Sequence, residues 1–202
     1  MILLNKKTAK DIDKYLIEDI GYTIDLLVEQ AGCAVANSVE KFLLSSNNYL
    51  KYREINIFAG KGNNGLDAFA CARILNSKNY PVNIWEVNDN DNKMEEVSLQ
   101  KKLCTVSGIH ISNAENFLVD SNQLIIDGIF GVSFNPDRRL SDYYTAVFAK
   151  INKSSMLGGY IFSIDIPSGI DPDTGNIFDF SIRANRTVTF IFPKTGIISY
   201  PG

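Results

Sequence analysis

The stretch INIFAGKGNNGLDAFACARIL, residues 55–75, decides the fold class of this chain. Its apolar run from Ile55 to Phe58 predicts a strand, and the glycine-rich segment that follows predicts a tight turn. Apolar residues then recur at helical spacing from Ala68 to Leu75 and predict a helix. The unit is therefore a strand, a glycine-rich turn and a helix.

Strand and helix patterns alternate along the rest of the chain. Two helices are expected before this unit, over residues 6–19 and 23–44, with a break near Gly21. After it we expect strands over 82–87, 124–126, 160–164 and 187–192, and helices over 93–104 and 141–154. Such alternation is typical of a mostly parallel sheet covered on both faces. The sequence thus predicts an α/β fold, a Rossmann-like three-layer α/β/α sandwich, with residues 1–202 as a single domain.

The composition argues against several classes of protein. With 45% hydrophobic and 21% charged residues the chain is typical of globular proteins, and no apolar run approaches the ~20 residues of a membrane span. A net charge of -3 with no basic run argues against nucleic-acid binding, and a single histidine, His110, argues against sites built on imidazole. No secretory signal and no C-x-x-C pair are visible. We therefore expect a cytoplasmic protein with neither membrane nor nucleic acid as a partner.

The glycine-rich turn is the first of three candidate site loops. It reads GKGNNGLD over residues 60–67, and at the start of a helix it offers backbone N–H groups and the helix dipole to a phosphate. Its first six residues also match G-x-G-x-x-G, and Glu86 lies about 20 residues further on, like the ribose-binding acid of a Rossmann site. The alternative is a tight turn in which Asn63 or Asn64 only caps the helix.

Two further loops carry an aspartate at the end of a strand. Asp127 opens the loop 127–139, and Asp165 precedes a Pro-Ser-Gly turn that contains Ser168. Asparagine, aspartate and serine side chains from separate loops offer hard oxygen ligands for a cation such as potassium or magnesium. Each aspartate alone also suits a helix cap or a turn, but loops that follow parallel strands lie on one edge of the sheet. For Lys194, after the last expected strand, a solvated turn lysine is favoured over a phosphate contact.

Several blocks in a fixed order resemble the NAD(P)H-hydrate epimerase family, the N-terminal domain of bacterial YjeF proteins, whose animal members are also described as apolipoprotein A-I binding protein. The blocks are LLVEQAGCAVA at 26–36, GKGNNGLD at 60–67, DGIFGVSF at 127–134, IDIPSGID at 164–171 and TVTFIFPK at 187–194. They run along nearly the whole chain, so the resemblance is more specific than one glycine loop.

The resemblance implies an isomerase that interconverts the R and S forms of hydrated NADH and NADPH, called NADHX and NADPHX. It also implies potassium as the cofactor, a homodimer as the assembly, and Asn64, Asp127 and Ser168 as the potassium ligands. The implied substrate-binding residues are Asn63, Asn64, Gly65, Leu66, Asp67, Gly131, Val132, Ser133, Phe134, Asn135, Pro136, Asp137 and Asp165.

The chain departs from the family pattern at two positions of these loops. Leu66 stands where the family has a second glycine, and places a bulkier side chain beside the expected substrate path. Asn135 stands where many members carry a lysine, which removes one candidate proton carrier. The sequence ends at Gly202, near where the family continues into one more strand, and we expect a single domain without the dehydratase domain that is fused in many bacterial members.

The implied substrate carries a hydroxyl group on the carbon beside the ring nitrogen, so its loss needs an acid and its return needs a base. We nominate Asp127 for this proton transfer. Because a bound cation would lower the pKa of its carboxyl group, Asp165 and Asp67 are the alternative proton carriers. Two other functions stay open: a non-catalytic binding or scaffold module, and an NAD-dependent oxidoreductase, against which no Tyr-x-x-x-Lys pair or catalytic histidine is evident.

Overall fold

A six-stranded sheet forms the centre of this computed structural model, which describes residues 2–45, 48–52, 54–88, 99–133, 140–177 and 180–198. The strand order is β3-β2-β1-β4-β5-β6, and every neighbouring pair is parallel. This confirms the expected sheet, and the order is that of a doubly wound fold. The strands are β1 (Ile55–Ala59), β2 (Val82–Glu86), β3 (His110–Asn113), β4 (Leu124–Gly128), β5 (Tyr160–Ile164) and β6 (Arg186–Val188).

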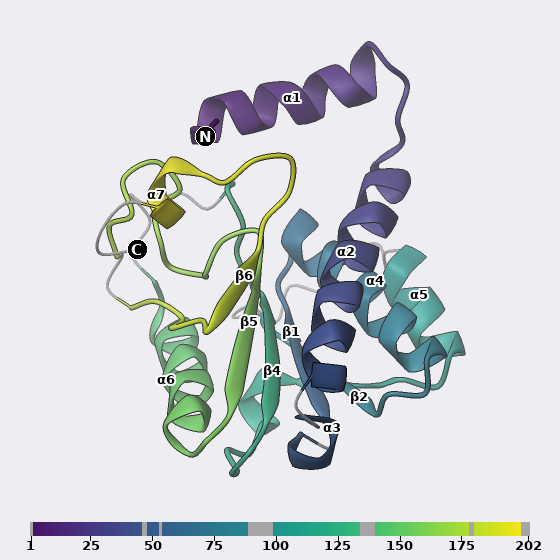
Figure 1. Cartoon of the computed structure of the whole chain (residues 1–202), viewed down its shortest axis with the longest axis vertical. Helices are drawn as coiled ribbons and strands as arrows, with labels where there is room; N and C mark the ends of the chain where they lie inside the picture. Colours follow the sequence, from purple (N-terminus) through teal and green to yellow (C-terminus); the bar gives the residue numbers. More distant parts are fainter. Residues whose placement is uncertain are drawn as a thin grey trace.

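Helices cover both faces of the sheet, so the three-layer α/β/α sandwich is confirmed (Figure 1). One face carries α2, α4 and α5, the other carries α6, and α1 lies across one edge of the molecule. Within the described parts of the chain, no helix is long and apolar enough to cross a membrane. The helices are α1 (Lys6–Glu18), α2 (Ile24–Leu44), α3 (Asn48–Lys51), α4 (Asn63–Ser77), α5 (Leu99–Val106), α6 (Asp142–Met156), α7 (Thr195–Ile198) and a 3₁₀ turn (Ala114–Asn116).

The central strands feed two separate cores, one on each face of the sheet. In β4, Leu124 and Ile126 belong to the core with α2 and α4, whereas Ile125 packs with Phe148 of α6. This alternation follows from the two-residue period of a strand. All three β4 side chains are fully buried because both faces are covered, which is why the strand reads as a continuous apolar run.

Several elements differ from the sequence-based expectation, and among them the pattern does not predict the short helices α3 and α7. The pattern also does not predict β3, a short edge strand in which Ile111 is the one apolar residue and no residue is fully buried. The strand expected over 187–192 ends at Val188, because the chain turns sharply at Ile191, where φ is +65°. The helix expected over 93–104 is observed as α5 from Leu99, and residues 93–98 lie outside the described part of the chain.

The strand order reverses between β1 and β4, which is where an open α/β sheet forms a crevice beyond its carboxyl ends. The loop after β1 leads into α4 on one face of the sheet, and the chain after β4 leads to α6 on the other. The register sets Ala59 beside Gly128, and Asp127 beside Ser163 of β5. The three candidate loops therefore start from adjacent strand ends.

Two glycines of the first loop allow the backbone to close tightly at this crevice. A Cβ atom on Gly65 would lie 1.9 Å from the carbonyl oxygen of Gly60, and a Cβ atom on Gly60 would lie 2.0 Å from that of Ile129. Gly62 instead has open space where a Cβ atom would project, and its φ of -93° suits any residue. Backbone packing therefore requires the glycines at 60 and 65 but not the one at 62.

We expect Gly65→Ala to lower the free energy of unfolding by about 2–4 kcal/mol, since α4 would have to move away from the loop to accept the methyl group. The matched control is Gly62→Ser, which adds a side chain of the kind preferred at an N-cap and should change stability by no more than about 1 kcal/mol. Urea denaturation of both variants measures the difference. Equal stability of the two variants would contradict this account of the loop.

Candidate active site

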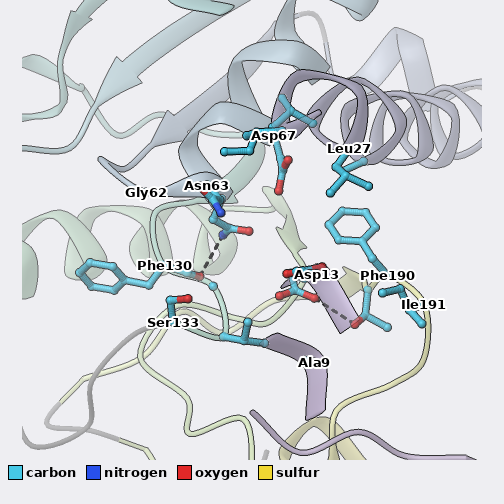
Figure 2. Close-up of a pocket in the computed structure, with 18 of the residues that line it drawn as sticks. Ala9, Asp13, Leu27, Gly62, Asn63, Asp67, Phe130, Ser133, Phe190 and Ile191 are labelled. Carbon is cyan, nitrogen blue, oxygen red and sulfur yellow. Dashed lines mark hydrogen bonds between the residues drawn. The ribbon is translucent and has the colours of Figure 1, made fainter. Parts of the chain in front are cut away.

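A cavity of about 1030 Å³ lies over the carboxyl ends of β1, β4 and β5. Its walls come from α1 with Leu4 before it, the start of α2, the loop from β1 into α4, residues that follow β4 and start α6, Asp165, and residues 189–194. Figure 2 shows Asp13, Asp67, Ser133 and Phe190 projecting toward a shared space. The loops proposed from the sequence therefore meet at one cavity.

Most of the substrate-binding residues implied by the resemblance lie in this wall. Those that line the cavity are Asn63, Asn64, Asp67, Gly131, Val132, Ser133 and Asp165. Gly65 and Leu66 are not among the lining residues: Gly65 packs on Gly60, and Leu66 is partly buried. The larger side chain at 66 therefore does not narrow the cavity. Phe134, Asn135, Pro136 and Asp137 lie outside the described residues.

Asp127 lies behind the cavity wall and is completely buried. Its Oδ2 accepts hydrogen bonds from the Ser163 hydroxyl (2.8 Å) and the Ser168 N–H (2.9 Å). Its Oδ1 accepts from the Ser168 hydroxyl (2.6 Å) and the Ile129 N–H (3.2 Å). Burial raises the pKa of this carboxyl group, and these four hydrogen bonds lower it. The geometry thus favours Asp127 as a structural anchor of the loops over contact with a substrate.

The three implied potassium ligands gather around the backbone of Phe130. Its carbonyl oxygen accepts from the Asn64 amide (2.9 Å) and lies 3.4 Å from the Ser168 hydroxyl, which also contacts Asp127. The Asn64 side chain is therefore engaged with the second loop and does not cap α4, which begins one residue before it. Carbonyl, amide and hydroxyl oxygens with one carboxylate suit an alkali cation. Among the described residues, no group of three His, Cys, Asp or Glu side chains could hold a metal ion.

Lys194 is the buried cation of the cavity, which corrects its interpretation as a solvated turn lysine. Only 3% of its surface is exposed, and its ammonium group forms an ion pair with Asp165. It also donates to the Thr189 hydroxyl (3.0 Å) and the Phe190 carbonyl (3.2 Å). A buried charge requires such pairing. The sequence could not show it because the partner lies 29 residues away.

Asp165 is held in an unusual backbone conformation at the end of β5. Its φ is +64°, and the Ile166 N–H donates to the Ile164 carbonyl at 2.7 Å, closing a three-residue turn around it. A non-glycine residue in this region stores strain that is typical of functional sites. The Asp165 N–H also donates to the Val188 carbonyl at 2.8 Å, so its position depends on β6. The turn directs the carboxylate to Lys194.

Asp67 and Asp13 add two more carboxyl groups to the same cavity. The pKa of Asp67 is raised well above its ordinary value by burial and by the negative charges of Asp165 and Asp13. The pKa of Asp13 is raised by burial and by Asp165, an effect that Lys194 partly offsets. Asp13 was not among the site residues expected from the sequence. Its position four residues after Ala9 on an amphipathic helix is the signal that could have identified it.

Glu86 does not take part in this site. Its carboxylate forms an ion pair with Lys101 of α5, and it is not among the residues that line the cavity. The dinucleotide fingerprint of the oxidoreductase hypothesis needs this carboxylate at the ribose. The geometry therefore disfavours that hypothesis.

The chain is similar to one family and to proteins that share most of its length. Residues 24–196 match the family model described as YjeF-related protein N-terminus. Proteins named NAD(P)H-hydrate epimerase from Oenococcus oeni and Limosilactobacillus fermentum are 32% and 31% identical, and the matches cover 100% and 94% of this chain and 90% and 86% of theirs. The crystal structure of yeast ynu0, YNL200c, matches with a TM-score of 0.82 and 26% identity over 98% of this chain and 83% of its own.

We expect Asp67→Asn to be more stable than the unmodified protein at neutral pH. Because the pKa of Asp67 is raised in the folded state, folding takes up a proton between the ordinary pKa near ~4 and the raised value, and stability falls as pH rises through that window. The asparagine removes this loss, so the melting temperatures should differ at pH 8 and converge toward pH 4. The control is Asp11→Asn, which removes a carboxyl group of α1 that does not line the cavity and should leave the pH dependence of stability as it is in the unmodified protein. A less stable Asp67→Asn variant at pH 8 would contradict the prediction.

Proposed function

The chain belongs to the family of YjeF-related protein N-termini, and we propose that it epimerises the R and S forms of hydrated NADH and NADPH. The observation that carries the proposal is that one cavity at the strand ends holds both Asp67, a carboxyl group with a raised pKa, and Asp165, a carboxylate paired with a buried lysine. The names of the two bacterial relatives support the same reaction.

The chemistry needs one proton donor and one proton acceptor. When the hydroxyl group leaves, its C–O bond breaks, the electron pair stays on oxygen, and a proton from an acid completes a water molecule while the ring nitrogen forms an iminium ion. Water then adds to the opposite face of the same carbon and gives a proton to a base. Each proton lost by the acid is balanced by one gained by the base.

We assign the acid to Asp67 and the base to Asp165. A raised pKa makes Asp67 hold a proton more readily than an ordinary carboxyl group does, which suits an acid catalyst. The ion pair with Lys194 fixes the position of the Asp165 carboxylate in the cavity wall. This replaces our nomination of Asp127, whose four hydrogen bonds and complete burial suit an anchoring role.

The cavity walls offer complementary surfaces for a dinucleotide. No side chain caps the start of α4 at Gly62, and Gly62 and Asn63 line the cavity, so the positive end of the α4 dipole suits a phosphate there. Leu27 and Phe190 line the space near Asp67 and suit the apolar faces of a nicotinamide ring (Figure 2). Roughly 1000 Å³ is at the upper end of the usual range for small-molecule sites.

Potassium is the cofactor that we propose for the oxygen ligands around Phe130. Asn64, Asp127 and Ser168 would hold it, since Asn64 and Ser168 both contact the Phe130 carbonyl and Ser168 also contacts Asp127, which gathers neutral oxygens and one carboxylate around that backbone. A bound alkali cation would supply positive charge beside the loops that carry the substrate phosphates. Asp127 would then join the loops after β4 and β5 both through its hydrogen bonds and through the ion.

We expect the protein to equilibrate a pure R epimer of NADHX within minutes at micromolar enzyme, with chromatography of the two epimers as the measurement. Asp165→Asn should lower the rate by about 100-fold or more, as is usual when a general acid or base is lost, with unchanged circular dichroism. Asp127→Asn should instead lower the melting temperature. Asparagine has one amide oxygen in place of two carboxylate oxygens, and its NH₂ group cannot accept hydrogen bonds from the donors that surround Asp127. Unchanged epimer lifetimes with the unmodified protein would reject the enzyme and favour a binding module.

We expect potassium chloride to raise the melting temperature above that in tetramethylammonium chloride at equal ionic strength, because only the small cation fits between the loops. Stabilisation by a bound ion follows mass action, and about 1 kcal/mol corresponds to about 2–4 °C for a protein of this size. Ser168→Ala should abolish the difference. Ser133→Ala, a serine of the cavity wall outside the ligand set, should keep it. The same melting temperature in both salts would argue against the cation site.

A further inference from the structure

Helix α1 forms one wall of the cavity through residues of a single face. Ala9, Asp13, Leu16 and Ile17 line the cavity, and their spacing of four, three and one places them along one side of a helix. Asp13 is the only charged residue among those four. Asp13 is itself exposed in the cavity wall, and the opposite side of the helix carries further exposed lysines and acids. The helix therefore presents one carboxyl group to an otherwise apolar wall.

The N-terminal end of α1 is attached to the segment that carries Lys194. The Leu4 N–H donates to the Pro193 carbonyl (2.9 Å), and the Thr195 N–H donates to the Leu4 carbonyl (2.9 Å). These two hydrogen bonds involve the residues directly before and after Lys194, and together they form a parallel β-bridge between Leu4 and Lys194. Asn5 caps the helix directly afterwards, accepting from the Thr8 N–H at 2.7 Å. The position of Asp13 is thus coupled to the lysine that pairs with Asp165.

The other end of α1 is fixed by the turn into α2. The Tyr22 N–H donates to the Leu16 carbonyl at 2.9 Å, and Gly21 adopts a φ of +88° that allows the chain to reverse. Thr23 then caps α2 by accepting from the Leu26 N–H. Figure 1 shows α1 spanning the molecule between these two attachments. The helix is therefore an anchored wall of the site.

The charges around Asp13 are mostly negative. Asp67 from α4 and Asp165 after β5 share its cavity, and the buried Lys194 is already bonded to Asp165, Thr189 and Phe190. The other titratable or charged groups that line the cavity are Tyr22, Lys61 and Tyr144. Figure 2 shows Asp67 and Asp13 approaching the space from different elements. Asp13 therefore adds a negative charge that Asp67 experiences across the cavity.

We propose that Asp13 is a positioning residue of this site. Helix α1 brings the Asp13 carboxylate into the cavity that also contains Asp67, and the negative charge of Asp13 helps Asp67 to keep the proton that the departing hydroxyl group takes up. The role in turnover rests on the proposed epimerase function, whereas the electrostatic coupling does not. Burial and the charges of Asp165 and Asp13 all raise the pKa of Asp67, which agrees with the geometry.

The sign of the effect follows from charge removal. Asp13→Asn keeps the size of the side chain and removes its negative charge, so the pKa of Asp67 must fall. A lower pKa leaves less of Asp67 in its acid form on the alkaline side of its titration midpoint, whereas well below that midpoint Asp67 is protonated with or without Asp13. Asp13→Asn should therefore slow epimerisation several-fold on the alkaline limb of the pH–rate profile, and the rate should recover as the pH falls.

The first experiment follows the carboxyl carbon of Asp67 by NMR titration of ¹³C-labelled protein, with Asp67→Asn used to assign the signal. Asp13→Asn should move the titration midpoint to lower pH, and Asp13→Glu should largely restore it. The control Asp11→Asn also removes a carboxylate from α1, but from a residue that does not line the cavity. It should leave the titration midpoint of Asp67 unchanged. An unchanged midpoint in Asp13→Asn would overturn the proposal, whether or not the protein is an epimerase.

The second experiment compares pH–rate profiles for R-NADHX. We expect the alkaline limb of the profile to shift to lower pH in Asp13→Asn and to return in Asp13→Glu, with native circular dichroism in both. A uniform loss of rate at every pH, without recovery in acid, would assign Asp13 a merely structural role and overturn the proposal. An inactive unmodified protein would reject the epimerase function alone, because the NMR titration still decides the coupling.

Discussion

The fully buried carboxylate of Asp127 is the group on which the arrangement of the site depends. It joins β4 to β5 through Ser163, and it fixes the loops that follow both strands through the backbone of Ile129 and Ser168. Removing this buried carboxylate would be costly. The N–H and O–H groups that donate to it would remain buried without a hydrogen-bond partner and without contact to water. The backbone of Phe130, and through it Asn64 of α4, is positioned by the same network. One side chain thus sets three loops relative to one another.

The chemistry of the cavity follows from an imbalance of charge on this rigid frame. The wall that can be described contains Asp13, Asp67 and Asp165, and the lysine nearest to them is committed to Asp165. With more carboxyl groups than paired cations, an unpaired carboxyl group keeps its proton most easily, and burial together with the charges of Asp165 and Asp13 raises the pKa of Asp67. Carboxyl groups in different environments in one cavity suit the proposed reaction, which both releases and adds water.

The parts of the fold that a sequence can predict are those with a strong local period. Covered on both faces, β1, β4 and β5 read as continuous apolar runs, and the expected boundaries lie within a few residues of the observed ones. The edge strand β3 has no such pattern, because its backbone pairs with only one neighbour and its side chains stay largely exposed. The segment after Val188 looked like a strand because its residues are apolar. They are apolar because they line a cavity and not because they extend the sheet.

The sequence by itself determined the parallel α/β sandwich, the family and the strand-end loops that carry the site, because strand and helix periods and the order of loop motifs are local properties of the chain. Only the tertiary structure decided which carboxyl groups meet. Asp127 looks equivalent to Asp165 in sequence, each ending an apolar strand, yet one turns inward to its hydrogen bonds and the other outward to the cavity. Burial, the distance between charges, and the approach of α1 from the far end of the chain arise only when segments remote in sequence pack together, and these decide which carboxyl group holds a proton.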